Sequence, residues 1–183
     1  MTAPERPRLY LVVPGGVAPA DVLAALGGGD VAAVELDAAL IGCVPAIQAL
    51  GVAVLVRDDV AAARAADGVF LSDPDADVGA ARRALGPGAI VGVRAADRHG
   101  AMVAGEAGAD VVAFDDLALV AWWAETMVVP CLARGIERLA DVAVAVAAGA
   151  DFLAVEDAVW HAAAAPAAAI AALNEAVDRA WPS

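Results

Sequence analysis

Charged side chains follow nearly every short apolar run in this sequence, and they are the residues best suited to chemistry. Carboxylates can bind a divalent cation through oxygen ligands or act as acid and base, and arginines can bind anions. Because charged residues are also common in loops, a salt-bridged rim without chemistry is a third interpretation. No member of the set is singled out as a catalytic residue. The set comprises Glu35, Asp37, Arg57, Asp58, Asp59, Asp73, Asp75, Arg94, Asp115, Asp116, Arg134, Glu156 and Asp157.

Asp58 and Asp75 are the pair that we favour as metal ligands. Each follows one of two consecutive apolar runs, which would place the two carboxylates on neighbouring strands, within reach of one ion. Carboxylate oxygens are the ligands that Mg²⁺ prefers, so the pair predicts Mg²⁺ as a cofactor.

The three arginines of the set are expected to be neutralised inside the protein. Each has acidic neighbours in the predicted arrangement: Arg57 has Asp58 and Asp59, Arg94 has Asp73 and Asp115, and Arg134 has Glu156 and Asp157. Since planar guanidinium groups pair well with carboxylates, we predict internal ion pairs. The alternative is that the arginines together form a new anion site.

Composition limits the partners of the chain. Its 24 acidic residues against 11 basic ones give a formal net charge of −13, which repels nucleic acids and anionic lipids. Lysine is absent, so Schiff-base chemistry through lysine is excluded. There is no uninterrupted apolar run of membrane-spanning length and no signal-like segment in residues 1–8. We therefore expect a cytoplasmic protein without nucleic-acid or membrane partners.

An internal repeat indicates how the charged residues are positioned. The segment AGADVVAF (107–114) recurs almost unchanged as AGADFLAV (148–155), and a looser copy, AADGVFL, covers 65–71. The aspartates of the copies are roughly 40 residues apart, which is the length of two units of one strand and one helix. Each copy is typical of a helix end, a turn with glycine and a strand buried on both faces.

Further apolar runs, rich in β-branched residues, complete a set of eight predicted strands. They cover residues 9–13, 31–36, 52–56, 89–93 and 128–133. Ala-rich segments of helical length lie between strands, and two of them begin at Leu139 and Pro166. This alternation predicts an α/β fold, a single (β/α)8 TIM barrel with short loops, and an open doubly wound sheet is the alternative. We expect one domain over residues 1–183, with 1–8 disordered or an N-terminal extension.

From Leu9 to about Leu173 the sequence resembles the thiamine-phosphate synthases, also called thiamine-phosphate pyrophosphorylases, as a diverged member. Residues 56–76 (VRDDVAAARAADGVFLSDPDA) are similar to the family's Asn-Asp-Arg segment and its following Asp-Gly-Val-His-Leu-Gly-Gln-x-Asp stretch. The segments GPGAIVGV, AGADVVAF, VVPCLARGI and AGADFLAV fall where the family has similar framework motifs.

The resemblance implies a (β/α)8 barrel that joins hydroxymethylpyrimidine diphosphate to a thiazole phosphate, releases pyrophosphate and binds Mg²⁺ through two aspartates. Asp58 and Asp75 match those aspartates. Gly135 matches a glycine of the family's Gly-Gly-Ile phosphate loop, and Arg134 replaces the glycine before it. Arg134 and Gly135 are therefore weak candidates for phosphate binding.

Several positions depart from the family's pattern. Glu35 and Asp37 lie where the family has Gln-x-Arg-x-Lys, Asp59 replaces the arginine of Asn-Asp-Arg, and the loop that ends in Thr-x-Thr-Lys is missing between Phe114 and Pro130. A carboxylate about 4 Å from a phosphate replaces attraction with repulsion of several kcal/mol. We therefore expect the diphosphate clamp and the lysine loop of the family to be lost.

Two functions follow as hypotheses. The first is the family's transferase reaction in thiamine biosynthesis. The second is a catalytically inactive relative that binds a small molecule of thiazole or pyrimidine type, or a partner protein, in a regulatory role. A homodimer is also open, because the adjacent Trp122 and Trp123 cannot share one helix face and one of them could contact a second copy.

Overall fold

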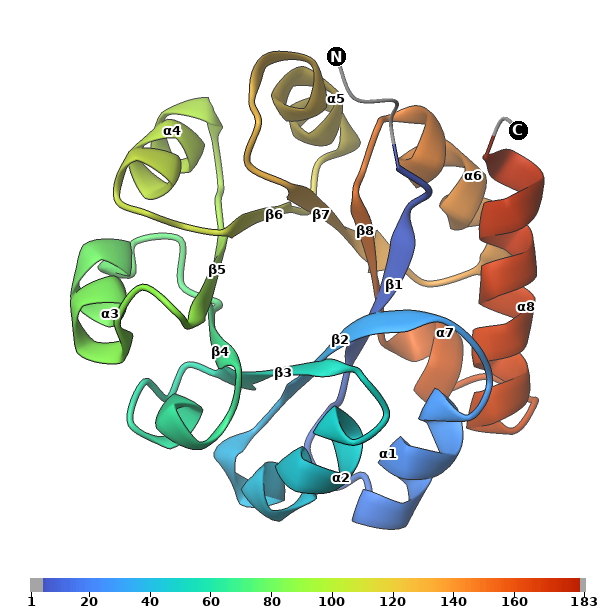
Figure 1. Ribbon diagram of the computed structural model, residues 1–183. Coiled ribbons are helices and arrows are strands. Elements are labelled where there is room, and N and C mark those ends of the chain that lie inside the picture. Colours follow the sequence, from blue (N-terminus) through green and yellow to red (C-terminus); the bar gives the residue numbers. More distant parts are fainter. Residues whose placement is uncertain (1–4, 182–183) are drawn as a thin grey trace.

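A computed structural model, which describes residues 5–181, has eight parallel strands that close into a barrel surrounded by helices (Figure 1). Each strand pairs with the next along the chain, and β1 pairs with β8, as in the contact of Leu11 with Val155. This confirms the predicted (β/α)8 barrel and excludes the open sheet. The strands are β1 (Arg8–Val12), β2 (Val31–Leu36), β3 (Ala53–Arg57), β4 (Gly68–Leu71), β5 (Ile90–Arg94), β6 (Val111–Phe114), β7 (Cys131–Ile136) and β8 (Phe152–Val155).

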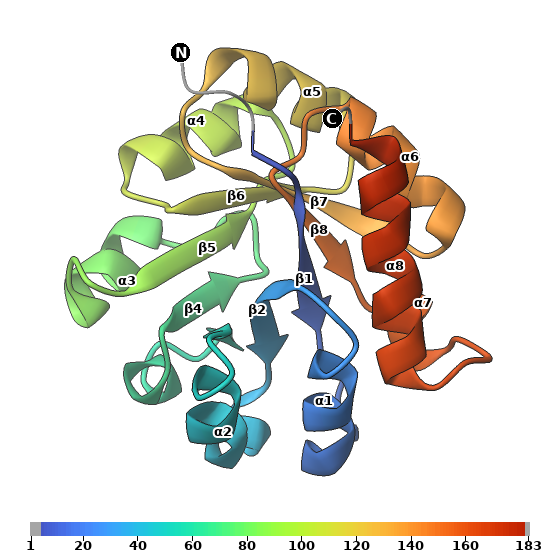
Figure 2. The ribbon, with the colours of Figure 1, turned by 45° about the vertical axis from the view of Figure 1, so that its right-hand side comes forward.

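The helices form the outer layer of the barrel (Figures 1 and 2). They are α1 (Pro19–Leu26), α2 (Val44–Gln48), α3 (Val78–Leu85), α4 (Arg98–Glu106), α5 (Leu117–Thr126), α6 (Leu139–Ala147), α7 (Asp157–Trp160) and α8 (Pro166–Ala180). The helices predicted to begin at Leu139 and Pro166 are α6 and α8. A 3-10 helix (Ala38–Cys43) precedes α2, and another (Ala62–Ala65) is the only helical element between β3 and β4. That short connection makes strand–helix alternation less regular than the sequence predicts.

Two apolar layers hold the barrel together. The larger one lies between strands and helices and includes Trp123 of α5, which is almost fully buried. The smaller one fills the barrel interior with inward-facing side chains, because alternate residues of each strand point to the same side. Its members are Tyr10, Val12, Ala33, Leu55, Phe70, Val111, Ala113, Leu132 and Ala154.

The repeated aspartates have the same structural role in all three copies. The carboxylates of Asp67, Asp110 and Asp151 accept hydrogen bonds of 2.7 to 2.8 Å from the backbone N–H of Val54, Val91 and Cys131, respectively. The backbone N–H of each aspartate in turn donates to the carbonyl of the same strand residue. The repeat therefore connects the beginning of every second strand to the strand that follows. In two copies the preceding glycine, Gly108 or Gly149, has a positive φ that ends the helix.

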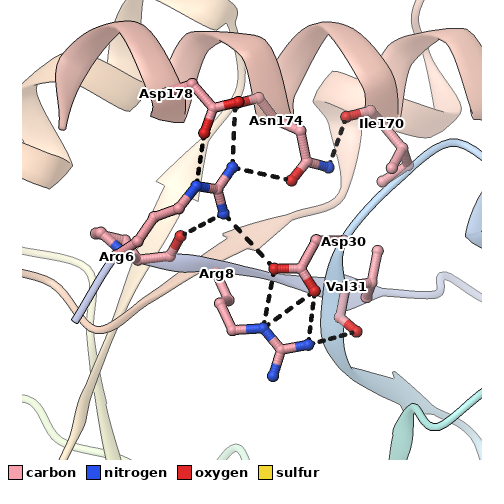
Figure 3. A network of polar contacts seen from close by, with 8 residues as sticks. Arg6, Arg8, Asp30, Val31, Ile170, Asn174 and Asp178 are labelled. Atoms are coloured by element: carbon pink, nitrogen blue, oxygen red, sulfur yellow. Dashed lines mark hydrogen bonds and ion pairs between the residues drawn. The ribbon is translucent and has the colours of Figure 1, made fainter. Parts of the chain in front are cut away.

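A second polar network connects the amino ends of β1 and β2 to α8 (Figure 3), and we call this place the seam. Arg6 donates a 2.6 Å hydrogen bond to Asp178 of α8 and also contacts Asn174 and Asp30. Arg8, the first residue of β1, pairs with Asp30 through two guanidinium nitrogens. The hydrogen bond from Arg8 lowers the pKa of Asp30 below its usual value. Of the extension expected over residues 1–8, residues 1–4 lie outside the described part.

Across residues 5–181, no helix is both long and apolar enough to cross a membrane.

Candidate functional site at the barrel mouth

Glu35 is the central charged residue of the barrel mouth. It is the last residue but one of β2, within the bounds predicted for that strand, and its side chain is fully buried. Two arginines neutralise it: Arg57 Nε lies 2.6 Å from Oε1, and Arg134 Nη1 lies 3.3 Å from Oε2. A buried carboxylate needs such partners because the removal of a charge from water costs several kcal/mol.

Arg57 links the buried Glu35 to the exposed acidic rim of the mouth. Its Nη1 lies 3.0 Å from Asp37 Oδ1, and its Nη2 donates to the carbonyl of Val13 at 3.3 Å. Burial lowers the pKa of the Arg57 guanidinium, but the charge of Glu35 and the hydrogen bond to it outweigh burial, and the pKa lies above its usual value. Arg57 is therefore a permanent cation held by carboxylates.

Tyr10 and Phe70 lie beneath this cluster in the barrel interior. The Arg134 guanidinium is 5.2 Å from the centre of the Phe70 ring, and the Tyr10 and Phe70 rings are 6.2 Å apart. The Tyr10 hydroxyl is buried and has no hydrogen-bond partner within residues 5–181. Burial, followed by the charge of Glu35, raises the pKa of Tyr10 well above its usual value, so the phenol stays neutral.

Asp58 directly follows β3 and has a backbone conformation that non-glycine residues rarely adopt, with φ of 53°. Its carboxylate accepts two hydrogen bonds from Ser72, one from the backbone N–H at 2.7 Å and one from the hydroxyl at 2.5 Å. These bonds fix the orientation of the carboxylate and leave lone pairs on both oxygens. Asp75 is exposed, and its backbone N–H donates to Asp73.

The remaining rim residues are mostly engaged in local structure. Asp59 accepts from the Ala62 N–H at the start of a 3-10 helix, and Asp116 caps α5 through the Ala118 N–H. Arg94, the last residue of β5, pairs with Asp115 at 2.5 Å. Asp157 lies 2.9 Å from Nδ1 of His161.

A small cavity of about 130 Å³ opens at the mouth between β7 and β8. Arg134 and Gly135 line it, and the φ of Gly135 is +77°, which favours glycine. Three acids, Glu137, Glu156 and Asp157, line it as well. Trp160 of α7 donates its indole N–H to the carbonyl of Val12 at 2.7 Å, which holds α7 near this edge.

The predicted ion pairing of the three arginines is confirmed, but of their predicted partners only Asp115 is correct. Arg94 pairs with Asp115 and not with Asp73, and Arg57 pairs with Glu35 and Asp37 instead of its sequence neighbours. Arg134 pairs with Glu35 across the mouth and not with Glu156 or Asp157. The reason is that Glu35 points into the interior, where it meets side chains from distant strands. Tyr10 was not among the predicted site residues, because a tyrosine within an apolar strand is typical of core packing.

Comparison with known proteins adds an independent line of evidence. The family model described as thiamine monophosphate synthase matches residues 23–117. A thiamine-phosphate synthase of Rhodospirillum centenum is 42% identical over 91% of this chain and 96% of its own length. One of Hyphomonas neptunium is 38% identical over 94% of this chain and 96% of its own.

Among solved structures, a thiamine phosphate pyrophosphorylase from Pyrococcus furiosus superposes with a TM-score of 0.85 at 21% identity, and covers 97% of this chain and 98% of that one. A structure described as native KDPGal superposes with a TM-score of 0.73 at 19% identity, over 98% of each chain. At these identities the superpositions are evidence of the fold alone.

Proposed function

Because the chain belongs to the thiamine-phosphate synthase family, we propose that it is a transferase that joins hydroxymethylpyrimidine diphosphate to a thiazole phosphate and releases pyrophosphate. The observation that carries the proposal is the similarity to named synthases over almost the whole chain and almost the whole of their length. The proposal includes a cytoplasmic location for this biosynthetic step.

Asp58 and Asp75 would hold Mg²⁺ in this reaction. Their carboxylates are exposed after β3 and β4, and they offer the oxygen ligands that Mg²⁺ prefers. In the described part of the chain, no cluster of three or more His, Cys, Asp or Glu residues is placed to hold a metal. Proteins usually bind Mg²⁺ through one or two carboxylates together with water and substrate phosphates, and Asp58 and Asp75 would supply those carboxylates. When bound, the ion would neutralise charge on the leaving diphosphate.

The chain's own residues would orient the reactants. Ser72 would keep the Asp58 carboxylate in a fixed orientation through its two hydrogen bonds. Arg134 uses one of its guanidinium nitrogens on Glu35 and stacks on Phe70, so its other N–H groups are available at the β7–β8 cavity. With Gly135 it would bind the phosphate of the thiazole substrate.

A specific observation favours a second candidate function. The cations closest to the mouth cavity are held by Glu35, and the cavity carries three carboxylates that would repel a phosphate. A catalytically inactive relative that binds an unphosphorylated thiazole or pyrimidine compound, as a regulatory protein, would suit such a cavity.

A steady-state assay with both phosphorylated substrates and Mg²⁺ tests the transferase. We expect turnover in the native chain and a loss of at least about a hundredfold in Asp58→Asn, since a ligand to the ion on the leaving group is removed. Asparagine tolerates a positive φ and still accepts hydrogen bonds from Ser72, so the variant should fold.

The two candidates differ in a second measurement. Native turnover equal to that of Asp58→Asn would contradict the transferase. In that case calorimetric titration should give tighter binding of thiamine than of thiamine phosphate if the chain is an inactive binding protein. Tighter binding of the phosphate would contradict that second function as well.

A further inference from the structure

The outer face of α4 carries an ordered stripe of exposed side chains. Arg98, Met102 and Glu106 are spaced by four residues, so they lie along one side of the helix. The stripe begins with a cation, continues with an apolar residue that is 43% exposed and ends with an anion. Val103, beside it, is 50% exposed.

The neighbouring end of α5 extends this apolar surface. Helices α4 and α5 lie side by side on the barrel wall (Figures 1 and 2), and Arg98 lies 4.8 Å from the centre of the Trp122 ring. A cavity of about 230 Å³ between them is lined by Met102, Glu106, Met127 and other mostly apolar residues. Val128, at the rim of the same cavity, is 99% exposed.

Neither charge of the stripe is neutralised within the protein. Among residues 5–181, neither Arg98 nor Glu106 forms an ion pair, whereas the three arginines at the barrel mouth and both at the seam do. A cation and an anion at equal distances on either side of Met102 are self-complementary under a twofold rotation through Met102.

We propose that this face, made of α4 and of Met127 and Val128, which follow α5, binds a second copy of the chain in a twofold-symmetric dimer. The two α4 helices run antiparallel, so that Arg98 of each copy meets Glu106 of the other and the Met102 side chains pack at the axis. Val128 of each copy then approaches the apolar cavity of the other. Burial of these exposed apolar groups drives association, and the two charge pairs fix the register.

The high net charge of the chain sets the conditions of the test. Two copies that each carry −13 repel each other at long range, and salt screens this repulsion. At about 0.15 M ionic strength the Debye length is near 8 Å, so the contact pairs remain effective while the long-range repulsion is reduced.

Sedimentation equilibrium under these conditions, up to about 100 μM chain, tests the proposal because an interface of micromolar affinity would be populated there. We expect a dimer in the native chain. Arg98→Glu and Glu106→Arg should each weaken dimerisation about tenfold or more, since the symmetric contact occurs twice and attraction becomes repulsion. The double variant, which restores opposite charges across the axis, should recover most of the native affinity.

Two control variants on α8 make the same changes of net charge elsewhere. Arg179→Glu and Glu175→Arg alter an exposed pair on another part of the barrel and should leave the dimer unchanged. Val128→Ser should weaken the dimer without any change of charge. The proposal would be overturned by a native chain that stays monomeric or by equal effects of the α4 and α8 variants on dimerisation. It would also be overturned if the double variant dimerised as weakly as the single variants.

Discussion

At the scale of single residues, the stability of the mouth depends on one buried carboxylate. Glu35 has no exposed surface, and both of its oxygens contact arginines from β3 and β7. The removal of one partner from a buried ion pair leaves a charge that the protein interior cannot solvate. The cost of such a change is much larger than for the exposed pairs of the rim, which contribute under about 1 kcal/mol.

Substitution of Glu35 by Gln should therefore lower the free energy of unfolding by about 3–5 kcal/mol, because Arg57 and Arg134 then lose their shared anion. Urea unfolding followed by circular dichroism measures the change. As a control, the replacement of Glu35, Arg57 and Arg134 together by Leu should cost less than Glu35→Gln alone, since no charge stays buried. Equal stability of Glu35→Gln and the native chain would contradict the role of Glu35 as the buried counter-ion of the two arginines.

Tyr10 carries a buried hydroxyl near the Glu35 carboxylate. The group is buried without a hydrogen-bond partner in the described part of the chain, and such a group loses its water without compensation. Tyr10→Phe should raise the free energy of unfolding by about 1–2 kcal/mol at neutral pH, because it removes the unpaired hydroxyl and keeps the ring against Phe70. Denaturant midpoints at equal slopes measure this, and a destabilised variant would mean that the hydroxyl has a partner.

At the scale of elements, the three repeated aspartates explain why the repeat exists. The carboxylate of each aspartate accepts a hydrogen bond from the backbone N–H of a residue at the start of one strand. The backbone N–H of the aspartate donates to the carbonyl of that same residue, so two neighbouring units are connected by two hydrogen bonds. The bonds join β3 to the start of β4, β5 to the start of β6 and β7 to the start of β8. Since these N–H groups are partly buried, few water molecules can replace the carboxylate.

Asp151→Ala should lower the free energy of unfolding by about 1–3 kcal/mol, because the Cys131 N–H is left without its acceptor. Asp151→Asn retains an acceptor oxygen and should cost clearly less. Asp110→Ala should cost at least as much as Asp151→Ala, because Asp110 also pairs with Arg82. Chemical unfolding of these variants measures the changes, with Glu175→Ala at an exposed position as the reference. Equal free energies of unfolding in all variants, the reference included, would contradict this role of the aspartates.

The elements themselves could largely be predicted from the sequence. Eight apolar runs and the repeat predict the closed barrel, because a strand buried on both faces has a continuous apolar signal. The ends of some strands could not be predicted: β7 (Cys131–Ile136) extends past the predicted 128–133, so Arg134 lies inside it. The bounds of β2 match the predicted 31–36, and Glu35 points into the barrel because it lies on the same face of that strand as the interior residue Ala33. There Glu35 meets Arg57 and Arg134, which changes the partners of these two arginines from the predicted ones. Contacts between distant strands depend on barrel closure, and local sequence contains no signal for them.

At the scale of the whole molecule, closure of the barrel buries two groups that must stay uncharged. Burial raises the pKa of the Cys131 thiol to about 12, and it raises the pKa of Tyr10 well above its usual value. In the unfolded chain both groups lose their protons near their ordinary values, about 8.5 for cysteine and 10 for tyrosine. The folded state then holds more protons than the unfolded state at alkaline pH, so the free energy of unfolding must fall as pH rises.

The stability that these two groups contribute is fully present below about pH 8.5, and it is lost progressively as pH rises toward the folded pKa of Cys131, about 12. Urea unfolding between pH 7 and 11 should therefore give a falling free energy of unfolding in the native chain. Tyr10→Phe should flatten the part of the decline above about pH 10, and Cys131→Ala the part that begins near pH 8.5, because each removes one titrating group. The comparison uses slopes against pH, so a constant loss of packing in Cys131→Ala does not affect it. If the double variant declined as steeply as the native chain, groups other than these two would control the alkaline stability of the barrel.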